Sequence, residues 1–244
     1  LSLSRLAYDM ESLVSPMLAA ALLTAISFHN LFAGTVVGFI ASALLVISVS
    51  LPSPKPAGRR SIYERTTRGL RIYLATPRLR GLLALSLAVS AAGSMVIVNT
   101  VVLVQSTFGL EQHDTALALA AFGGGSMVAA LALPGLLDEI SDRRAMLIGG
   151  LVLTAALLAS MLVSNFHLLV IFWLVLGLGY SLTQTPSGRL LRRSSQPEDR
   201  PALFAAQFAL SHACWLLTSP LAGWLGDTVG MQTTFLVMAA LAGA

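Results

Sequence analysis

The sequence has little charge, almost no cysteine and none of the common motifs of soluble enzymes. Charged residues make up 11% of its 244 positions, apolar residues make up 56%, and the mean hydropathy is +0.80. This balance excludes an ordinary soluble domain. The single cysteine, Cys214, allows no internal disulfide and gives no information about the redox compartment.

Motifs for catalysis and nucleotide binding are lacking as well. The sequence contains no HExxH, no GxSxG and no paired acids inside an apolar segment. The small residues at 123–126 form no phosphate loop, because no Lys-Ser or Lys-Thr pair follows them. His29, His113 and His167 lie in separate turns without the close spacing of metal ligands. We therefore predict that the chain is not an enzyme and needs no metal or other cofactor.

Long apolar segments are the main feature that the sequence does have. A helix needs about 20 apolar residues to cross the hydrocarbon core, and most of the segments approach or exceed that length. Alternating strand patterns are lacking, which favours helices over a barrel. The predicted fold is all-α, a polytopic membrane helix bundle with about eight transmembrane helices. The segments run over 13–29, 31–51, 81–107, 115–137, 145–163, 167–185, 203–224 and 231–244.

The basic residues are confined to alternate connections between these segments. They precede the first segment or follow the second, fourth and sixth. The other connections carry Glu111, Asp114, Asp227 and three of the four histidines, but no Lys or Arg. Cationic loops stay cytoplasmic, so the pattern predicts an integral membrane protein of a bacterial inner membrane with these connections inside. It also explains the pI of about 9.8 without a nucleic-acid partner. The connections contain Arg5; Lys55, Arg59, Arg60, Arg65, Arg68, Arg71, Arg78 and Arg80; Arg143 and Arg144; Arg189, Arg192, Arg193 and Arg200.

The chain divides at one polar segment, 52–80, which follows two apolar segments and precedes six. It opens with Pro52, Pro54 and Pro56 and continues with arginines interleaved among apolar residues. An amphipathic helix at the cytoplasmic headgroups and a solvated basic linker both fit this pattern. Because the chain starts without methionine and its last apolar run is short, we expect a fragment of a longer protein.

This order of segments resembles the rear two-thirds of a major facilitator superfamily (MFS) transporter. That family has twelve helices in two halves joined by a long cytoplasmic loop. The resemblance implies that 1–51 holds the last two helices of the N-terminal bundle and 52–80 the central loop. Residues 81–244 would form the C-terminal six-helix bundle, with helices 7–12 and the last one truncated.

Two local motifs support the resemblance. LPGLLDEISDRRAMLIGG is similar to the family's signature between helices 8 and 9, which implies a cytoplasmic charge latch formed by Asp138, Arg143 and Arg144. Ser141 and other residues depart from that signature. The stretch containing Ser15, Pro16, Ala19 and Ala20 resembles the helix-5 element of proton-exchanging exporters, with small residues in place of glycines, and so it favours efflux over uptake.

Polar side chains inside the predicted spans are the candidates for a substrate cavity. In the family, helices 7 and 10 line the cavity and helices 8 and 11 flank it. Polar stripes of this kind can also serve as hydrogen bonds between helices. Cys214 and Thr218 continue the stripe on the seventh predicted segment. The cavity candidates are Ser90, Ser94, Gln105, Tyr180, Gln184, Gln207 and Ser211.

His212 is the ionisable residue nearest the middle of a predicted span. Ionisable groups are costly in the bilayer and often functional there, and histidine titrates near physiological pH. It is therefore a candidate for proton coupling, although it lies roughly 140 degrees from Gln207 on its helix. A neutral histidine that bonds to a neighbouring helix is the alternative.

The expected function is secondary active transport by alternating access. The expected partners are a small-molecule substrate, a proton or other ion gradient and the lipid bilayer, and the expected state is a monomer. Proton-coupled efflux is the leading interpretation. An uptake carrier, a nickel or cobalt exporter of the same fold, and a non-transporting scaffold or sensor are the alternatives.

Overall fold

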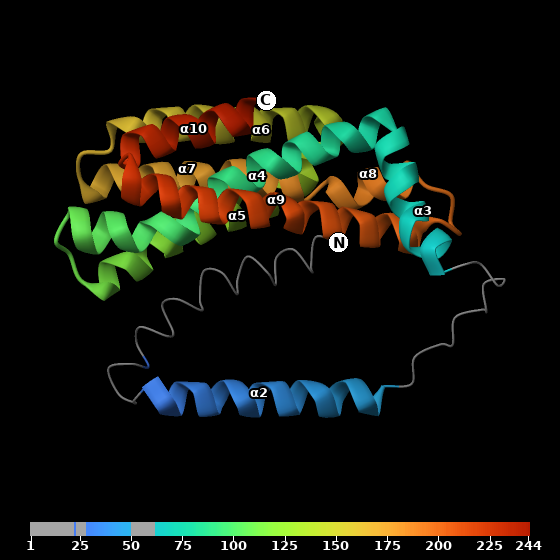
Figure 1. The fold of residues 1–244 in the computed structure, drawn as a ribbon, viewed down its shortest axis with the longest axis horizontal. Coiled ribbons are helices and arrows are strands. Elements are labelled where there is room, and N and C mark those ends of the chain that lie inside the picture. Colours follow the sequence, from blue (N-terminus) through green and yellow to red (C-terminus); the bar gives the residue numbers. More distant parts are fainter. Residues whose placement is uncertain (1–21, 23–27, 50–61) are drawn as a thin grey trace.

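The computed structural model describes residue 22, residues 28–49 and residues 62–244, and every regular element in these ranges is helical (Figure 1). The predicted all-α fold is therefore confirmed. The helix-5 element and most of the first predicted segment lie outside the described residues. The elements are α2 Phe28–Ser48, α3 Ile62–Ala75, α4 Pro77–Val101, η1 Val102–Thr107, α5 Gln112–Glu139, α6 Asp142–Ala159, η2 Ser160–Leu162, α7 Phe166–Gln184, α8 Ser187–Arg193, α9 Arg200–Thr228 and α10 Met231–Gly243.

Five stretches of the described chain are long and apolar enough to cross a membrane. Two shorter apolar helices, Phe32–Ser48 and Met231–Gly243, accompany them. These lengths confirm the predicted membrane bundle, and the observed bounds differ from the predicted ones by a few residues. The five stretches are Pro77–Thr107, Gln112–Glu139, Asp142–Leu162, Phe166–Arg193 and Arg200–Thr228.

Local sequence explains where several of these helices begin. Pro77 occupies the first turn of α4, where its missing N–H is not needed. The Ser141 hydroxyl accepts from the backbone N–H of Arg144 at the start of α6. Asn165 caps α7 in the same way, with its side-chain oxygen 3.0 Å from the backbone nitrogen of Leu168. Gly230 has φ of +86° in the turn before α10, a conformation that favours glycine.

The bundle is built from two interlocked triplets of helices, α4–α5–α6 and α7–α9–α10. The second helix of each triplet packs against the first helix of the other, so α5 lies on α7 and α9 lies on α4. The third helices, α6 and α10, pack against each other, and each also contacts the first helix of the opposite triplet. An exchange of this kind is expected for a three-plus-three repeat inside one transporter half.

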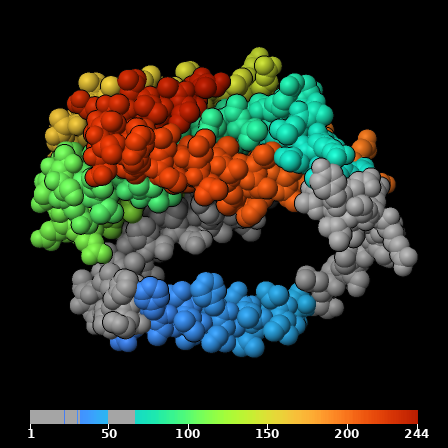
Figure 2. All heavy atoms as spheres, in the orientation of Figure 1, coloured from blue at the N-terminus to red at the C-terminus, as the bar shows by residue number. Residues whose placement is uncertain are grey.

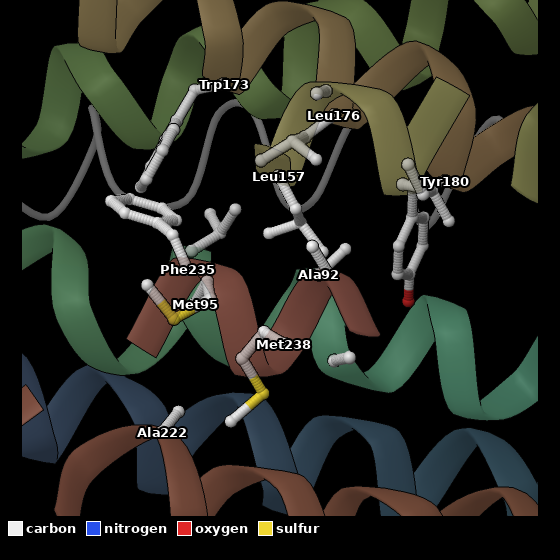
Figure 3. Packing of buried hydrophobic residues seen from close by; sticks show 14 of the residues in the cluster. Ala92, Met95, Leu157, Trp173, Leu176, Tyr180, Ala222, Phe235 and Met238 are labelled. Atoms are coloured by element: carbon white, nitrogen blue, oxygen red, sulfur yellow. The ribbon is translucent and has the colours of Figure 1, made fainter. Parts of the chain in front are cut away.

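Small residues allow the helices of the core to approach closely. A Cβ atom added at Gly125 of α5 would lie 1.9 Å from the Leu174 carbonyl oxygen, and one at Gly177 of α7 would lie 1.9 Å from that of Phe122. The two glycines therefore make α5 and α7 touch through their backbones. Larger side chains from α4, α7 and α10 fill the middle of the bundle, among them Trp173, which contacts Phe235 edge-on (Figure 3).

The polar segment 52–80 contains the helix α3, as the amphipathic interpretation predicted. Its apolar side packs against α9 rather than facing away from the bundle: Tyr73 is fully buried and Ile72 is half-buried, whereas Leu70 and Leu74 are exposed. Figure 2 shows the surface of α9 running along the bundle to α3, which covers one end of it. The described part of the segment, 62–80, is thus not a solvated linker.

Candidate functional site

A row of polar contacts joins α4 to α9, and we call it the polar seam. The Ser94 hydroxyl lies 2.8 Å from the Thr218 hydroxyl and 3.0 Å from that of Ser219. Nearer the start of both helices, Gln207 Nε2 donates to the Ser86 hydroxyl at 3.2 Å. Ser86, Ser94 and Thr218 are buried, so each of these groups needs a partner inside the protein.

Asn99 completes the polar seam towards the far ends of the two helices. Its side-chain nitrogen donates to the Ala222 carbonyl at 3.2 Å and approaches the Met95 sulfur at 3.3 Å. Gly226 leaves room for it, because a Cβ atom there would lie 2.9 Å from Asn99 Oδ1. A buried amide that reaches a backbone carbonyl of the neighbouring helix fixes the two helices in one register.

Thr100 connects α4 to α7 on another side. The Trp173 indole nitrogen donates to the Thr100 hydroxyl at 2.7 Å, and that hydroxyl donates to the Val96 carbonyl of its own helix. Both side chains are fully buried. The first helix of one triplet is therefore hydrogen-bonded to the first helix of the other, at the centre of the bundle.

Three of the predicted cavity residues lie in helix–helix packing. Ser90 is fully buried and donates to the Leu87 carbonyl of α4, while Ser94 and Gln207 belong to the polar seam. For Ser94 and Gln207 this geometry favours the alternative that polar side chains hold helices together, whereas Ser90 bonds only within α4. Asn99 belongs to the polar seam, and Thr100 belongs to the separate contact with α7. Neither had been predicted, although their polarity inside an apolar run is a visible signal.

The other four cavity candidates are scattered. Gln105 is exposed in the π-helical segment η1, and its Nε2 donates to the Thr115 hydroxyl at 3.2 Å. Tyr180 is nearly buried and meets the Phe122 ring edge-on at 5.3 Å. Gln184 is half-buried, and Ser211 donates to the carbonyl one turn before it on α9. These contacts do not join the four residues to one another, and their place in a cavity stays a prediction.

His212 is exposed on α9, roughly 140 degrees from Gln207 but on the same side as Ser219, which lines the same groove. Its Nδ1 atom is 2.7 Å from the Phe208 carbonyl of the same helix, and its ring stacks at 3.9 Å on the Phe208 ring. An open, mainly apolar groove surrounds it, with Trp215 and Leu216 in the lining. The hydrogen bond is thus within one helix, not to a neighbouring helix as the alternative had it.

The arginines that the structure describes gather at one end of the bundle. This arginine-rich end comprises α3, α8, the α5–α6 turn and the first turns of α4 and α9. Asp142, at the first position of α6, is 8% exposed and accepts from Arg189 and from Arg193, the latter at 3.0 Å. It ties the start of α6 to α8, which directly follows α7.

The buried ion pairs at this end thus involve Asp142 and not the predicted Asp138. Asp138 is exposed at the end of α5 and forms no ion pair with any described residue, and Arg143 and Arg144 are exposed as well. The reason is positional: Asp142 faces the bundle from the first turn of α6, whereas Asp138 faces away from it. The sequence contained a signal for this ion pair, because Arg189 and Arg193 are four residues apart. On a helix they share one face, where an acidic side chain can pair with both.

The opposite end of the bundle holds a small group of ionisable side chains, of which Glu111 and His113 are exposed and Asp114 is half-buried. Glu111 and Asp114 form the capping box of α5, and the His113 ring nitrogens are 3.6 and 3.3 Å from their carboxylates. Over the described ranges, no three His, Cys, Asp or Glu side chains are arranged to hold a metal ion. Their observed use is to begin a helix.

Spanning helices, paired polar groups between them and arginines at one end define an integral membrane protein built as a transporter-type helix bundle. The sequence model of one protein family, the Major Facilitator Superfamily, matches residues 83–244, which is more than half of the chain. The chain belongs to this family. It is accordingly a membrane transporter that acts on a small molecule, and members of this family are typically not enzymes. A comparison with curated proteins found no match.

Proposed function

We propose that the protein is a proton-coupled exporter that works by alternating access, and that residues 81–244 form one of its two moving halves. The family membership supports transport, and the exposed His212 on α9 is the observation that carries the proton coupling. In this mechanism, one half rocks against the other around a central path, and a proton moves against the substrate. No other described Asp, Glu, Lys, Arg or His lies near the middle of a spanning helix.

The hydrogen bond of His212 leaves one ring nitrogen able to take a proton. The Phe208 carbonyl can only accept, so His212 Nδ1 must carry the hydrogen in that bond. The lone pair of the neutral ring is then on Nε2, the atom left for an incoming proton. The stacked Phe208 ring offers its face to the resulting cation. The mainly apolar groove beside it suits a small amphipathic substrate.

We place the arginine-rich end in the cytoplasm of a bacterium, with the protein in the inner membrane as a monomer. The positive-inside rule supports this orientation, because the exposed arginines are concentrated at that end. Asp142 and its two arginines would then close a cytoplasmic contact between α6 and α8. This contact lies within one half, so it supports a half that moves as a rigid unit.

The test is substrate-driven proton movement by the purified natural chain in proteoliposomes that contain a pH-sensitive dye. A proton gradient is imposed, and lipophilic cations, siderophores and nickel or cobalt salts are added one at a time. Export by antiport predicts that one class of compound triggers proton movement. Silence across the panel, with folding shown by circular dichroism, would contradict proton-coupled export, and proton-independent substrate uptake would support a carrier of the opposite direction.

A further inference from the structure

Three kinds of contact fix the helix α3 to the rest of the arginine-rich end, chiefly to α9. Arg68 Nε donates to Asp199 Oδ1 at 2.7 Å, and the Asp199 side chain is only 17% exposed. Gly69 lies against the backbone of α9, since a Cβ atom there would be 2.1 Å from the Ala202 carbonyl oxygen. Tyr73, one turn later, is fully buried. These contacts fix both the position and the rotation of α3.

Tyr73 begins a chain of hydrogen bonds that passes through three helices. Its hydroxyl donates to Gln207 Oε1 on α9, and Gln207 Nε2 donates to the Ser86 hydroxyl on α4 at 3.2 Å. Ser86 in turn donates to the Leu82 carbonyl at 2.9 Å. Burial raises the pKa of the Tyr73 phenol, so the group remains a donor over the physiological range.

Tyr73 also belongs to a small cluster of buried apolar residues that is separate from the main core. It joins α3, α4, α6, α8 and α9 at the arginine-rich end. Met146 is one helical turn after Asp142, and Leu191 lies between Arg189 and Arg193, so the cluster adjoins the Asp142 ion pairs. Its buried members are Tyr73, Leu79, Leu82, Met146, Leu191, Leu203 and Ala206.

We propose that α3 is a positioning element that locks α4 and α9 in one register, with Tyr73 and Gln207 as its positioning residues. In the arrangement that the structure shows, Gln207 bonds to α3 and α4 at the same time. If α3 leaves α9, or if α4 slides along α9, buried polar groups lose their partners. The helix also precedes α4 in the chain, so a displacement of the preceding segment reaches α9 through α3. The role in transport rests on the proposed function, whereas the register lock does not.

The lock itself is measured by amide hydrogen exchange of the natural chain in proteoliposomes. Tyr73→Phe keeps the ring and removes only the hydroxyl, and Gln207→Leu removes the bridge. Both changes should make the amides of 67–75 exchange roughly tenfold faster, because one buried partner is lost. Ser211→Ala is the matched control, since that hydroxyl bonds only within α9 and should leave 67–75 unchanged. Unchanged exchange in both test variants would overturn the proposal.

Transport kinetics separate this role from a place in the substrate cavity. A positioning role predicts that Gln207→Leu lowers the maximal rate and leaves KM unchanged, whereas a substrate contact would raise KM. In the double variant Tyr73→Phe/Gln207→Leu, the loss of maximal rate, expressed as a free energy, should be smaller than the sum of the losses in the two single variants. A raised KM without faster exchange at 67–75 would overturn the proposal. If exchange is faster in the variants but the parent protein itself transports nothing, the register lock is retained and the proposed function is rejected.

Discussion

At the scale of single residues, the fold depends on polar groups that each have a defined partner. In a bilayer, water cannot replace a lost partner, so these pairs determine which helix faces are compatible. Outside the apolar part of the bundle, at its arginine-rich end, Asp142 also has defined partners, because it is 8% exposed and faces two arginines. Asp138, only four residues away, is exposed and lies outside the network.

Asp142→Asn should lower the free energy of unfolding by about 1–2 kcal/mol, because it removes the charge but leaves two arginines beside a buried amide. The figure is modest because the Arg189 and Arg193 side chains are 40% and 70% exposed. Unfolding in SDS measures the change. Asp138→Asn is the control and should have no effect. Equal effects of the two substitutions would contradict the assignment of the latch to Asp142.

Thr100→Val should cost about 1 kcal/mol, because it leaves the buried indole N–H of Trp173 without an acceptor. The new side chain has nearly the same shape, so the packing of α4 on α7 is retained. Thr154→Val makes the same chemical change where the hydroxyl bonds only to the Gly150 carbonyl of its own helix. If SDS titrations give the two variants the same stability, the Thr100–Trp173 bond is not a structural contact.

At the scale of helices, close backbone approach determines how α5 fits α7. Gly125 and Gly177 each face a carbonyl of the other helix, and neither has room for a methyl group. Gly124, directly beside Gly125, faces open space with nothing within 4 Å of an added Cβ. Neighbouring glycines thus differ entirely in their structural role.

Gly177→Ala should destabilise the bundle by about 1–3 kcal/mol, because the methyl group forces α7 away from α5. Gly124→Ala should leave stability unchanged or raise it by up to about 1 kcal/mol, since alanine favours the helix. The apparent melting temperature in detergent measures both. A Gly177→Ala protein as stable as the parent would show that α5 and α7 do not pack through their backbones.

The helices themselves could be predicted from the sequence, but most of their contacts could not. Long apolar runs, with arginines in alternate connections between them, define spans such as α4 and α9. They can be recognised because the hydropathy of a segment depends on its own residues alone. A helical wheel placed Gln207, Ser211 and Thr218 on one stripe. It could not show that Gln207 meets Tyr73 and Ser86, since that depends on which helices become neighbours. The pairing of Asp142 with α8 was missed for the same reason.

At the scale of the whole molecule, the two faces of α9 have different surroundings. One face carries the polar seam and binds α3 and α4, and it holds the bundle in one register. The adjoining face exposes His212 with Phe208 and Leu216, and the groove there extends to Ser219 of the seam. A transporter half needs both: a rigid body that moves as a unit and a reactive face turned towards the path between the halves.

The most direct test of this account compares two adjacent positions on α9 in proteoliposomes. Substrate-driven proton movement is measured for His212→Gln and Ser211→Ala, together with substrate binding. We predict that His212→Gln still binds substrate but no longer moves protons, because glutamine cannot take a proton, and that Ser211→Ala behaves like the parent. Full proton movement in His212→Gln would contradict the account, because α9 would then carry no proton through that residue.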